Sequence, residues 1–496
     1  MNLAENLERT ARARGRSAAL TEGDRVTTFG ELDRDSRRVA GFLALQGVRP
    51  GDHVGVVVPN VPEFAALYYG ILRLGAVVVP MDPLLKEREV RHHLEDAGLR
   101  LLVAWSTTRE VVGPAARSVG ADLHLLGPGA LDDLVGGAPA LDRAEPRLPD
   151  DTAVILNTAG TTGQPKGAEL THGNLLRNCE VVVNDLVQLT SEDVVLGGLP
   201  LFHSFGLTAG LNAAVRAGAC LALLTRFSAE AALQTLHDRK VTVLVGVPSM
   251  YAAMLHAPHP REHDVSRLRV GVSGGAAMPV DVLLGFEEAF ECLVLEGYGL
   301  TESSPVATFN RRDRRRVGSI GLPAKGVELR VVDDAGADVD DGEPGEILVR
   351  GHNVMKGYWG HPAHTRAAIV DGWLRTGDVG LRDDDGFYYL VDRTTELINR
   401  GGYKVHPGEL EEVLREHPDV VEAAVVGRPH ATLGEEVCAV VTLRPLAATT
   451  GEELRDFVRA RVAAYKYPRV VDVVDEIPTT ATGTIRKRDI RLETRA

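Results

Sequence analysis

Short runs of β-branched and aliphatic residues, most of them ending in a glycine- or proline-rich turn, recur along the first 300 residues of the chain. Helical patterns at residues 29–48 and 63–75 alternate with strand-like runs at 53–58 and 76–80. Buried strands separated by helices favour a parallel sheet in an α/β layer. Five further strands are predicted on the same grounds, at residues 194–200, 220–225, 241–248, 268–276 and 292–299. The loops that follow such strands gather at one edge of a sheet, where α/β proteins bind ligands.

The length of 496 residues exceeds what one hydrophobic core usually organises, so we expect more than one domain. A Gly-, Pro- and Asp-rich stretch at 127–151 is expected to be a surface connection. From about Gly318 short alternating strands joined by Asp/Gly turns predict a small β-barrel over about 318–391. We therefore predict an N-terminal domain at 1–391 and a C-terminal domain at 392–496, divided at Asp392–Arg393.

The C-terminal domain has an α+β pattern of its own. Helices are predicted at residues 404–418 and 451–465, and strands at 420–429 and 437–445. No internal repeat or coiled-coil heptad is evident in the sequence.

Composition excludes several classes of function. A formal net charge of -14 argues against a broad nucleic-acid face, which needs a basic surface. The four cysteines lie far apart without metal-binding spacing, and we interpret them as buried apolar residues. The N-terminus lacks a signal-peptide pattern and no apolar run is long enough for a membrane span, so a cytoplasmic location is expected. The sequence does not indicate an oligomeric state.

The segment at 157–167, Asn-Thr-Ala-Gly-Thr-Thr-Gly-Gln-Pro-Lys-Gly, follows a predicted strand at 152–157. Its glycines let the backbone curl so that N–H groups face an anion, while hydroxyls and Lys166 add donors and a positive charge. A Walker loop would place its lysine at the start of a helix, which Pro165 and Gly167 disfavour. We predict a phosphate loop of another kind; the alternative is a flexible surface loop.

This segment resembles the phosphate loop of the adenylate-forming superfamily, which includes acyl-CoA synthetases, aryl-CoA ligases, luciferases and peptide-synthetase adenylation domains. The resemblance extends over essentially the whole chain, and its texture is closest to actinobacterial fatty-acyl or aryl-acid CoA ligases. It implies a large α/β domain, a small mobile C-terminal domain with a hinge at Asp392, and an acid–AMP intermediate. In the loop it implies a catalytic Lys166 and nucleotide contacts from Thr158, Gly160, Thr161, Thr162 and Gly163.

Two further segments resemble the family's nucleotide-binding motifs. One contains Gly274, Gly275 and Ala276, and the other runs through Glu296, Gly297, Tyr298, Gly299, Leu300, Thr301 and Glu302. Small residues let a flat base lie against the backbone, and Tyr298 offers a stacking face. Thr301 is expected to donate to the α-phosphate and Glu302 to bind Mg²⁺. A turn followed by a helix cap is the alternative interpretation.

The resemblance assigns the ribose to the segment Thr376-Gly377-Asp378, whose carboxylate would bind both hydroxyls, and to Arg393 beside the hinge. The plainer interpretations are an Asp/Gly turn and a surface ion pair. In the C-terminal domain, Gly401, Gly402 and Tyr403 resemble the stretch that rotates inward to form the thioester. Glycines there would admit an extended thiol arm such as that of CoA.

Two positions depart from the family pattern. Thr484 stands where a lysine normally follows the glycine of the terminal motif, and Ala159 stands where the phosphate loop usually has serine. The missing lysine bridges the carboxylate and the α-phosphate, so its loss is expected to weaken adenylation of an ordinary acid. Lys487, three residues on, is a possible substitute. Specialisation for another acid, an engineered change and loss of activity all stay open.

The segment at 200–207 resembles the family's acid pocket. It places His203 near the acid, with Phe205 or Leu207 along the wall, and Val247, Met250 and Tyr251 supplying more of it. A core loop with one satisfied histidine is the alternative. Peptide-synthetase domains hold the substrate's ammonium with an aspartate in this region, and none is present here, so an α-amino acid is not expected.

Three hypotheses follow. The first is an acid–CoA ligase that uses ATP, Mg²⁺ and CoA and acts on a fatty or aryl acid. The second is an ATP-dependent diazotase that activates nitrite and passes it to an arylamine, so that an amine replaces CoA as acceptor. The third is a non-catalytic nucleotide-binding protein.

Overall fold

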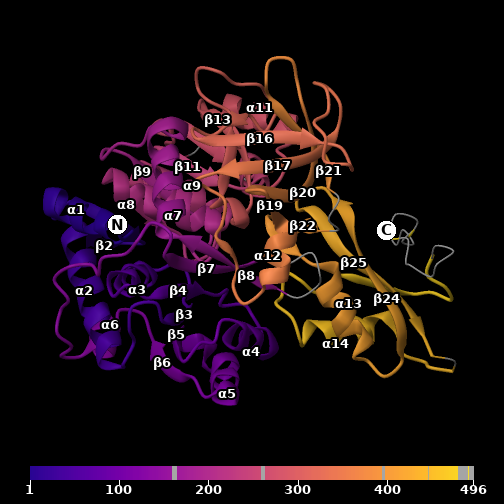
Figure 1. Ribbon diagram of the computed structural model, residues 1–496, viewed down its shortest axis with the longest axis horizontal. Helices are drawn as coiled ribbons and strands as arrows, with labels where there is room; N and C mark the ends of the chain where they lie inside the picture. Colours follow the sequence, from indigo (N-terminus) through magenta and orange to yellow (C-terminus); the bar gives the residue numbers. More distant parts are fainter. Residues whose placement is uncertain are drawn as a thin grey trace.

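The computed structural model describes residues 1–158, 165–257, 263–393, 397–444, 446–478, 487 and 490, apart from the side chains of Asp392 and Arg393. The chain forms two large sheets whose strands alternate along the sequence, a smaller antiparallel sheet, and a C-terminal α+β unit that lies to one side of the rest (Figure 1). Within the described residues, no helix combines the length and apolarity that a membrane crossing requires.

The largest sheet has nine strands and is parallel from β13 to β1. In spatial order its strands are β15 (Leu322–Pro323), β14 (Val306–Phe309), β13 (Leu293–Gly299), β12 (Val270–Ser273), β11 (Val243–Gly246), β9 (Val194–Gly197), β10 (Cys220–Leu223), β1 (Ala18–Glu22) and β2 (Arg25–Thr28). The five strands predicted between residues 194 and 299 are all present in this sheet.

The second sheet has seven strands, and it contains the early strands predicted from the helix–strand alternation. Its order is β18 (Gly357–Tyr358), β8 (Lys166–Thr171), β7 (Thr152–Thr158), β4 (Val77–Pro80), β3 (His53–Val57), β5 (Leu101–Trp105) and β6 (Asp122–Leu126). Strands β7 to β6 are parallel, whereas β8 and β18 run antiparallel at one edge.

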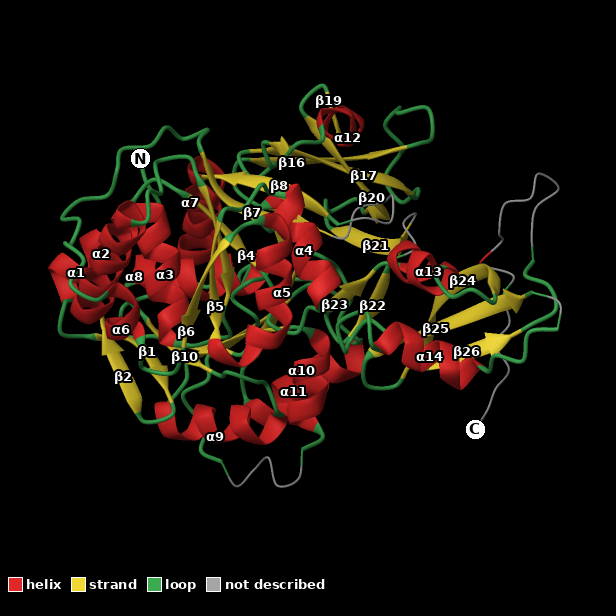
Figure 2. Ribbon diagram, turned by 90° about the horizontal axis from the view of Figure 1, so that it is seen from below, coloured by secondary structure: helices red, strands yellow, loops and turns green. Residues whose placement is uncertain are grey.

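Helices fill the space between the two large sheets and cover both outer faces (Figure 2). Successive strand residues point to opposite faces, so Val56 joins the central core while Val57 packs on the outer face. The central layer contains α1 (Glu5–Arg14), α2 (Phe29–Leu45), α3 (Pro62–Arg73), α7 (His172–Val181) and α8 (Ala213–Ala217). The outer layers contain α4 (Glu87–Asp96) and α5 (Arg109–Val119) on one side, and α9 (Ala229–Arg239), α10 (Pro248–Leu255) and α11 (Val280–Phe290) on the other.

Local chemistry sets where several helices begin. Thr28 and Glu31 form a reciprocal capping box at the start of α2, and Ser228 caps α9 in the same position. The stretch at 127–151, expected to be a plain connection, also forms the short helix α6 (Leu131–Val135).

Residues 318–391, where a small barrel was expected, form most of a five-stranded antiparallel sheet. Its strands are β16 (Val327–Val332), β17 (Gly345–Gly351), β20 (Trp373–Arg382) and β19 (Ile369–Val370), with β21 (Tyr388–Arg393) also paired to β20. Helix α12 (Pro362–Ala368) leads into β19.

The C-terminal domain carries its own sheet and its own core. The sheet contains β23 (Tyr403–Val405), β22 (Ile398–Arg400), β25 (Gly434–Leu443), β24 (Val420–His430) and β26 (Val470–Val473), covered by α13 (Pro407–Arg415) and α14 (Gly451–Arg459).

Both C-terminal helices are shorter than predicted. The first begins at Pro407 because residues 403–405 pair as a strand, and proline is well suited to the first helical turn. The second ends at Arg459, and beyond it Val462 packs in the C-terminal core and Ala463 in the outer core of the seven-stranded sheet.

Candidate active site

The predicted phosphate loop connects the antiparallel strands β7 and β8. Thr158 and Lys166 face each other across this hairpin, at the edge of the seven-stranded sheet. Lys166 therefore begins a strand and not a helix, as its flanking residues predicted. Ala159, Gly160, Thr161, Thr162 and Gly163 lie outside the described residues.

Lys166 is buried, and its ammonium lies beside the ring of Tyr358. Its Nζ is 5.7 Å from the ring centroid. Burial lowers the pKa of Lys166, while the nearby Glu302 carboxylate acts in the opposite direction. The hydroxyl of Tyr358 donates a hydrogen bond to Glu302 Oε1 at 2.9 Å. Lys166 and Glu302, 136 positions apart in the sequence, thus converge on one tyrosine.

Tyr358 was missed by the sequence reasoning. It lies on β18, whose pairing with β8 brings residues 357–358 beside residues 168–169. Its only signal in the sequence is an aromatic pair between glycines, in Gly-Tyr-Trp-Gly at 357–360. That pattern does not reveal its partners.

Thr301 and Glu302 belong to a single 3₁₀ turn, η5 (Thr301–Ser303), directly after β13. The Oγ atoms of Thr301 and Ser204 are 3.4 Å apart. Ser204 follows His203, so the predicted nucleotide segment and the predicted acid segment lie side by side.

Tyr298 joins another pair of predicted motifs. Its hydroxyl donates to Asp378 Oδ2 at 2.8 Å, and both residues are buried. Asp378 lies on β20 opposite Arg393 of β21, so the two positions predicted to contact the ribose are neighbours, and Tyr298, predicted to stack on the base, joins them from the nine-stranded sheet. The side chains of Asp392 and Arg393 lie outside the described residues.

The two glycine-rich nucleotide segments leave neighbouring parallel strands. Ser273 of β12 pairs with Glu296 of β13, so Gly274 to Ala276 and Gly297 to Gly299 begin at the same edge. A Cβ on Gly299 would lie 1.7 Å from the carbonyl oxygen of Pro305, so a larger residue would displace the strand. Glu296 Oε1 accepts from the Met278 amide at 3.0 Å, and burial raises the pKa of this carboxyl to about 7.

The predicted acid pocket separates into residues near the surface and residues behind it. His203 is exposed, yet surrounding protein and the Lys404 ammonium lower the pKa of its imidazole to about 4. Phe205 is half-buried, and its ring lies 3.2 Å from the place where a Cβ on Gly274 would stand. Val247 occupies the N-cap position of α10, and its side chain lies beside Gly275.

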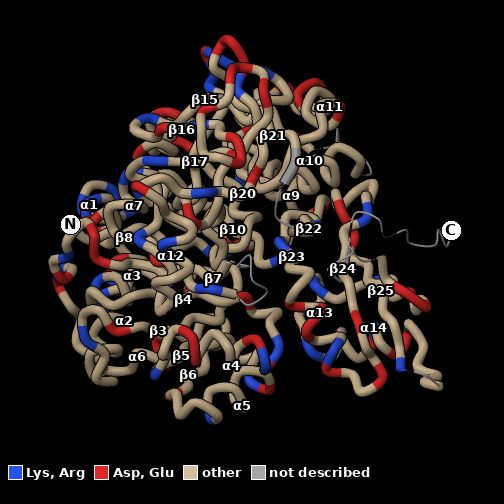
Figure 3. The backbone as a smooth tube through the Cα atoms, turned by 45° about the vertical axis from the view of Figure 1, so that its right-hand side comes forward, with Lys and Arg blue, Asp and Glu red and all other residues tan. Residues whose placement is uncertain are grey.

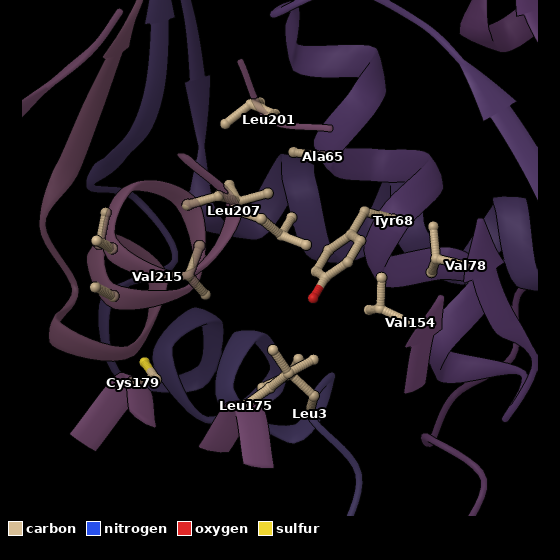
Figure 4. Close-up of a cluster of buried hydrophobic side chains, with 14 of the residues drawn as sticks. Leu3, Ala65, Tyr68, Val78, Val154, Leu175, Cys179, Leu201, Leu207 and Val215 are labelled. Carbon is tan, nitrogen blue, oxygen red and sulfur yellow. The ribbon is translucent and has the colours of Figure 1, made fainter. Parts of the chain in front are cut away.

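Three of the predicted pocket residues, Leu207, Tyr251 and Met250, are buried. Leu207 is fully buried in the segment η3 (Gly206–Asn212), among the core side chains drawn in Figure 4. Tyr251 is also fully buried, and its hydroxyl donates to the carbonyl of Leu244 at 3.2 Å. Met250 is 5% exposed. In this structure Leu207 and Tyr251 therefore lie within the packed core, and their place in the wall of the acid pocket stays a prediction.

The predicted second-substrate face lies against this site. Gly402 has a φ of +90°, and a Cβ there would lie 3.0 Å from both γ-carbons of Val247. The side chains of Asn399 and Lys404 donate to the carbonyl of Gly275 at 3.0 and 2.6 Å. Tyr403 stacks on Tyr465, with 4.2 Å between ring centroids. Asn399 and Lys404 belong to the stretch predicted for this face, but their own contacts were not predicted, because only the folded chain brings them to Gly275.

The terminal motif is mostly outside the described residues, Thr484 included. Lys487 is described, and its ammonium lies 2.7 Å from Glu411 Oε1 of α13. In this structure the possible substitute for the missing lysine is therefore paired within the C-terminal domain.

The described part of the chain holds no group of three or more His, Cys, Asp or Glu side chains arranged for a metal ion. Glu302 is a single carboxylate at the site, which fits a Mg²⁺ ion held mainly by substrate phosphates. All four cysteines are free thiols, and three of them, Cys179, Cys292 and Cys438, are buried.

A cavity of about 210 Å³ lies between α4 and the C-terminal domain, and residues of both line it. Charged side chains line both of its sides, among them Arg88 and Arg91 of α4, Glu409 and Glu412 of α13, and Lys466. Figure 3 shows residues of both charges on α4 and α13, on either side of this junction.

Comparison with known proteins assigns both parts of the chain. Residues 7–359 match the AMP-binding enzyme family, and residues 409–484 match the AMP-binding enzyme C-terminal domain. A feruloyl-CoA synthase of Amycolatopsis is 37% identical over 97% of this chain and 97% of its own length. A long-chain-fatty-acid–CoA ligase of Bacillus subtilis is 35% identical over 93% of this chain and 89% of its own length.

Two solved structures with different bound ligands are informative. An o-succinylbenzoate CoA synthetase of Bacillus subtilis, a double mutant bound with a CoA product analogue, matches with a TM-score of 0.87 and 29% identity, covering 97% of each chain. An anthranilate CoA ligase in complex with anthranoyl-AMP matches with a TM-score of 0.77 and 31% identity, covering 98% of this chain and 95% of its own.

Proposed function

The chain belongs to the family of AMP-binding enzymes, and on that premise we propose that it is an acid–CoA ligase that forms an acid–AMP intermediate from ATP. The observation that carries the proposal is the convergence of Lys166 and Glu302 on Tyr358, at the edge where the nucleotide segments end. Its substrates are then a carboxylic acid, ATP with Mg²⁺, and CoA.

In the first step a carboxylate oxygen of the acid attacks the α-phosphorus of ATP, and pyrophosphate leaves with the electron pair of the broken P–O bond. Lys166 neutralises charge on the phosphates, and Thr301 donates to the α-phosphate. Glu302 would hold a Mg²⁺ ion, which would supply positive charge to offset that of the leaving pyrophosphate. Tyr358 positions the Glu302 carboxylate through its hydrogen bond, and its ring lies beside the Lys166 ammonium.

The nucleotide would lie along the edge from β12 to β20. Asp378 accepts from the ribose hydroxyls, and the hydrogen bond from Tyr298 keeps its carboxylate in place. The backbone of Gly274, Gly275 and Ala276 and the segment from Glu296 to Gly299 contact the base. Arg393 contacts the ribose and phosphate, and the phosphate-loop residues Thr158, Gly160, Thr161, Thr162 and Gly163 supply donors.

In the second step the CoA thiolate attacks the acyl carbon, a C–S bond forms, and AMP leaves with the acid-derived oxygen. We assign this step to the placement of the C-terminal domain seen here, with Gly401, Gly402 and Tyr403 beside the site. Asp392, at the boundary between 1–391 and 392–496, is the proposed hinge between this placement and one used for adenylation.

The acid is proposed to be an aryl or fatty acid. Phe205 and Val247 offer an apolar wall, and the neutral imidazole of His203 stands at its entrance. The feruloyl-CoA and anthranilate relatives favour an aryl acid, and the long-chain relative keeps a fatty acid open to test.

The diazotase hypothesis rests on a resemblance and on the substitutions Ala159 and Thr484, and neither residue is among the described ones. None of the relatives named above is a diazotase. We therefore do not retain it as a second candidate. The relatives are enzymes, which also disfavours a purely nucleotide-binding role.

The test is AMP release from ATP across a panel of acids and acceptors. Ferulate, benzoate, anthranilate and a long-chain fatty acid are each assayed with CoA, with an arylamine and with no acceptor, and nitrite replaces the acid in a parallel arm. We expect AMP and a CoA thioester with an aryl or fatty acid. AMP release that requires nitrite and an arylamine but not CoA would contradict the proposal.

A further inference from the structure

A buried lysine of the C-terminal domain is paired with a carboxylate of the N-terminal domain. Lys466 Nζ lies 2.5 Å from Glu89 Oε1 of α4, and 2.8 and 3.1 Å from the two oxygens of Glu409 on α13. The three side chains are only 9%, 7% and 15% exposed. Burial opposes the charge on Lys466, but the two carboxylates raise the pKa of its ammonium well above the usual value, so it stays charged.

Only one of these two contacts crosses between domains. The pair with Glu409 stays within the C-terminal domain, because both residues belong to it. The pair with Glu89 forms only when that domain lies against α4. A buried charge that loses a partner is strongly disfavoured, so this contact selects one domain placement over others.

The segment around Lys466 connects this contact to the active site. Ala463 packs into the outer core of the seven-stranded sheet, and Tyr465 packs against that core and the C-terminal one. Tyr465 stacks on Tyr403, which adjoins Gly402. The loop of Gly402 in turn lies on Val247 and Gly275. The ion pair and the second-substrate face are thus two ends of one packed segment.

We propose that Lys466 is a positioning residue for the second step, which holds the C-terminal domain against Glu89 so that the Gly402 loop lies in the active site. This inference rests on the proposed function, and it assigns Lys466 to the second of the two proposed steps and not to the first. Lys466 does not touch the reacting atoms; it acts through the placement of Tyr465 and Tyr403.

The variant that isolates the contact is Glu89→Gln, because it leaves the Lys466–Glu409 pair intact within the C-terminal domain. The matched control is Glu87→Gln, which makes the same chemical change at an exposed position of the same helix. Lys466→Met and Lys466→Arg test the other partner, and arginine can still pair with both carboxylates.

The two steps are measured separately, with ferulate as the probe acid. The first is ferulate-dependent exchange of pyrophosphate into ATP, and the second is single-turnover transfer from feruloyl-AMP to CoA. For Glu89→Gln and Lys466→Met we expect transfer to fall about tenfold or more while exchange stays within about twofold. Lys466→Arg should recover much of the transfer rate, and Glu87→Gln should change neither step. An unchanged transfer rate in Glu89→Gln, or an equal loss of both steps, would overturn the proposal.

A distance measurement tests the placement without any catalytic readout. Spin labels are attached at Leu45 and Val421, which are both exposed. The distance between the labels, measured by electron paramagnetic resonance, reports the separation of the two domains. We expect one dominant distance in the unmodified protein and in Glu87→Gln, and a broadened distribution in Glu89→Gln. A single unchanged distance in Glu89→Gln would overturn the positioning role. Absence of any acid-dependent exchange in the unmodified protein would instead contradict the proposed function.

Discussion

The hydroxyl of Tyr298 on β13 donates to the carboxylate of Asp378 on β20 at 2.8 Å, joining two sheets at the edge where the predicted nucleotide motifs end. The two residues are 80 positions apart, and both are buried. A carboxylate held in this way is oriented before any ligand arrives, which favours binding of a ribose by paired acceptors.

Tyr298→Phe should weaken ATP binding more than it weakens the fold. A hydrogen bond to a charged acceptor contributes about 1.5 kcal/mol or more, so we expect the KM for ATP to rise about tenfold. The measurement is the ATP dependence of acid-driven pyrophosphate exchange. Tyr251→Phe is the control, because it removes a buried tyrosine hydroxyl bonded to Leu244 behind the pocket. An equal rise of KM in both variants would point to general destabilisation.

Lys166→Met should reduce acid-driven pyrophosphate exchange by about a hundredfold, because a preorganised cation at the phosphates is lost. The control is Lys356→Met on a neighbouring segment, where the side chain is half exposed and its Nζ lies 3.9 Å from Glu169. That variant should keep the exchange rate. A Lys166→Met enzyme with normal exchange would remove Lys166 from the catalytic set.

Glu296→Gln should alter how stability depends on pH. The folded protein raises the pKa of this carboxyl from 4.5 to about 7, so it binds a proton more readily when folded than when unfolded. The contribution of this protonated carboxyl to the free energy of unfolding is fully present below the unfolded pKa, and this contribution is lost as the pH rises through the folded pKa of about 7. Glutamine does not ionise. The free energy of unfolding of the variant, compared with that of the unmodified protein, should therefore rise by on the order of 2 kcal/mol from about pH 5 to about pH 8.

Chemical denaturation at the two pH values measures this gain. Glu288→Gln, an exposed change on α11, should show the same difference from the unmodified protein at both values. If Glu296→Gln behaves as Glu288→Gln does, the carboxyl of Glu296 is already ionised in the folded protein.

Thr484→Lys should raise turnover with a carboxylic acid by about tenfold or more, because an ammonium between two anions offsets their repulsion. Lys487 does not supply this charge in the described placement, since it lies against Glu411. Initial rates of AMP formation with ferulate and CoA measure the effect, and Thr482→Lys controls for added charge in the same segment. A lysine at 484 that abolishes activity would show that Thr484 belongs to a specialised site.

The sequence predicted the elements that position the site better than it predicted their contacts. Short continuous apolar runs identified strands such as β12 and β13, since burial on both faces leaves a nearly unbroken hydrophobic run. The pairing of Lys166 with Tyr358, by contrast, depends on β18 joining β8 from 190 residues away, which no local pattern encodes.

The same limit explains the pocket and the domain junction. The motif predicts Leu207 and Tyr251 as wall residues of the acid pocket, but it does not show how deeply helical geometry buries both of them. Helix α14 ends at Arg459, and Ala463 beyond it packs against the other domain, whereas a helix-period pattern alone would continue the helix. No local pattern indicates that Lys466 lies beside Glu89, which is 377 positions away in the sequence.

The most direct measurement follows an oxygen atom from the acid into the products. Ferulate labelled with ¹⁸O in its carboxylate is incubated with the enzyme, ATP, Mg²⁺ and CoA, and the products are analysed by mass spectrometry. Attack of the carboxylate on the α-phosphorus predicts one ¹⁸O in the phosphate of AMP, with unlabelled pyrophosphate beside it. Label in inorganic phosphate together with ADP would place the attack on the γ-phosphorus and contradict an acid–AMP intermediate.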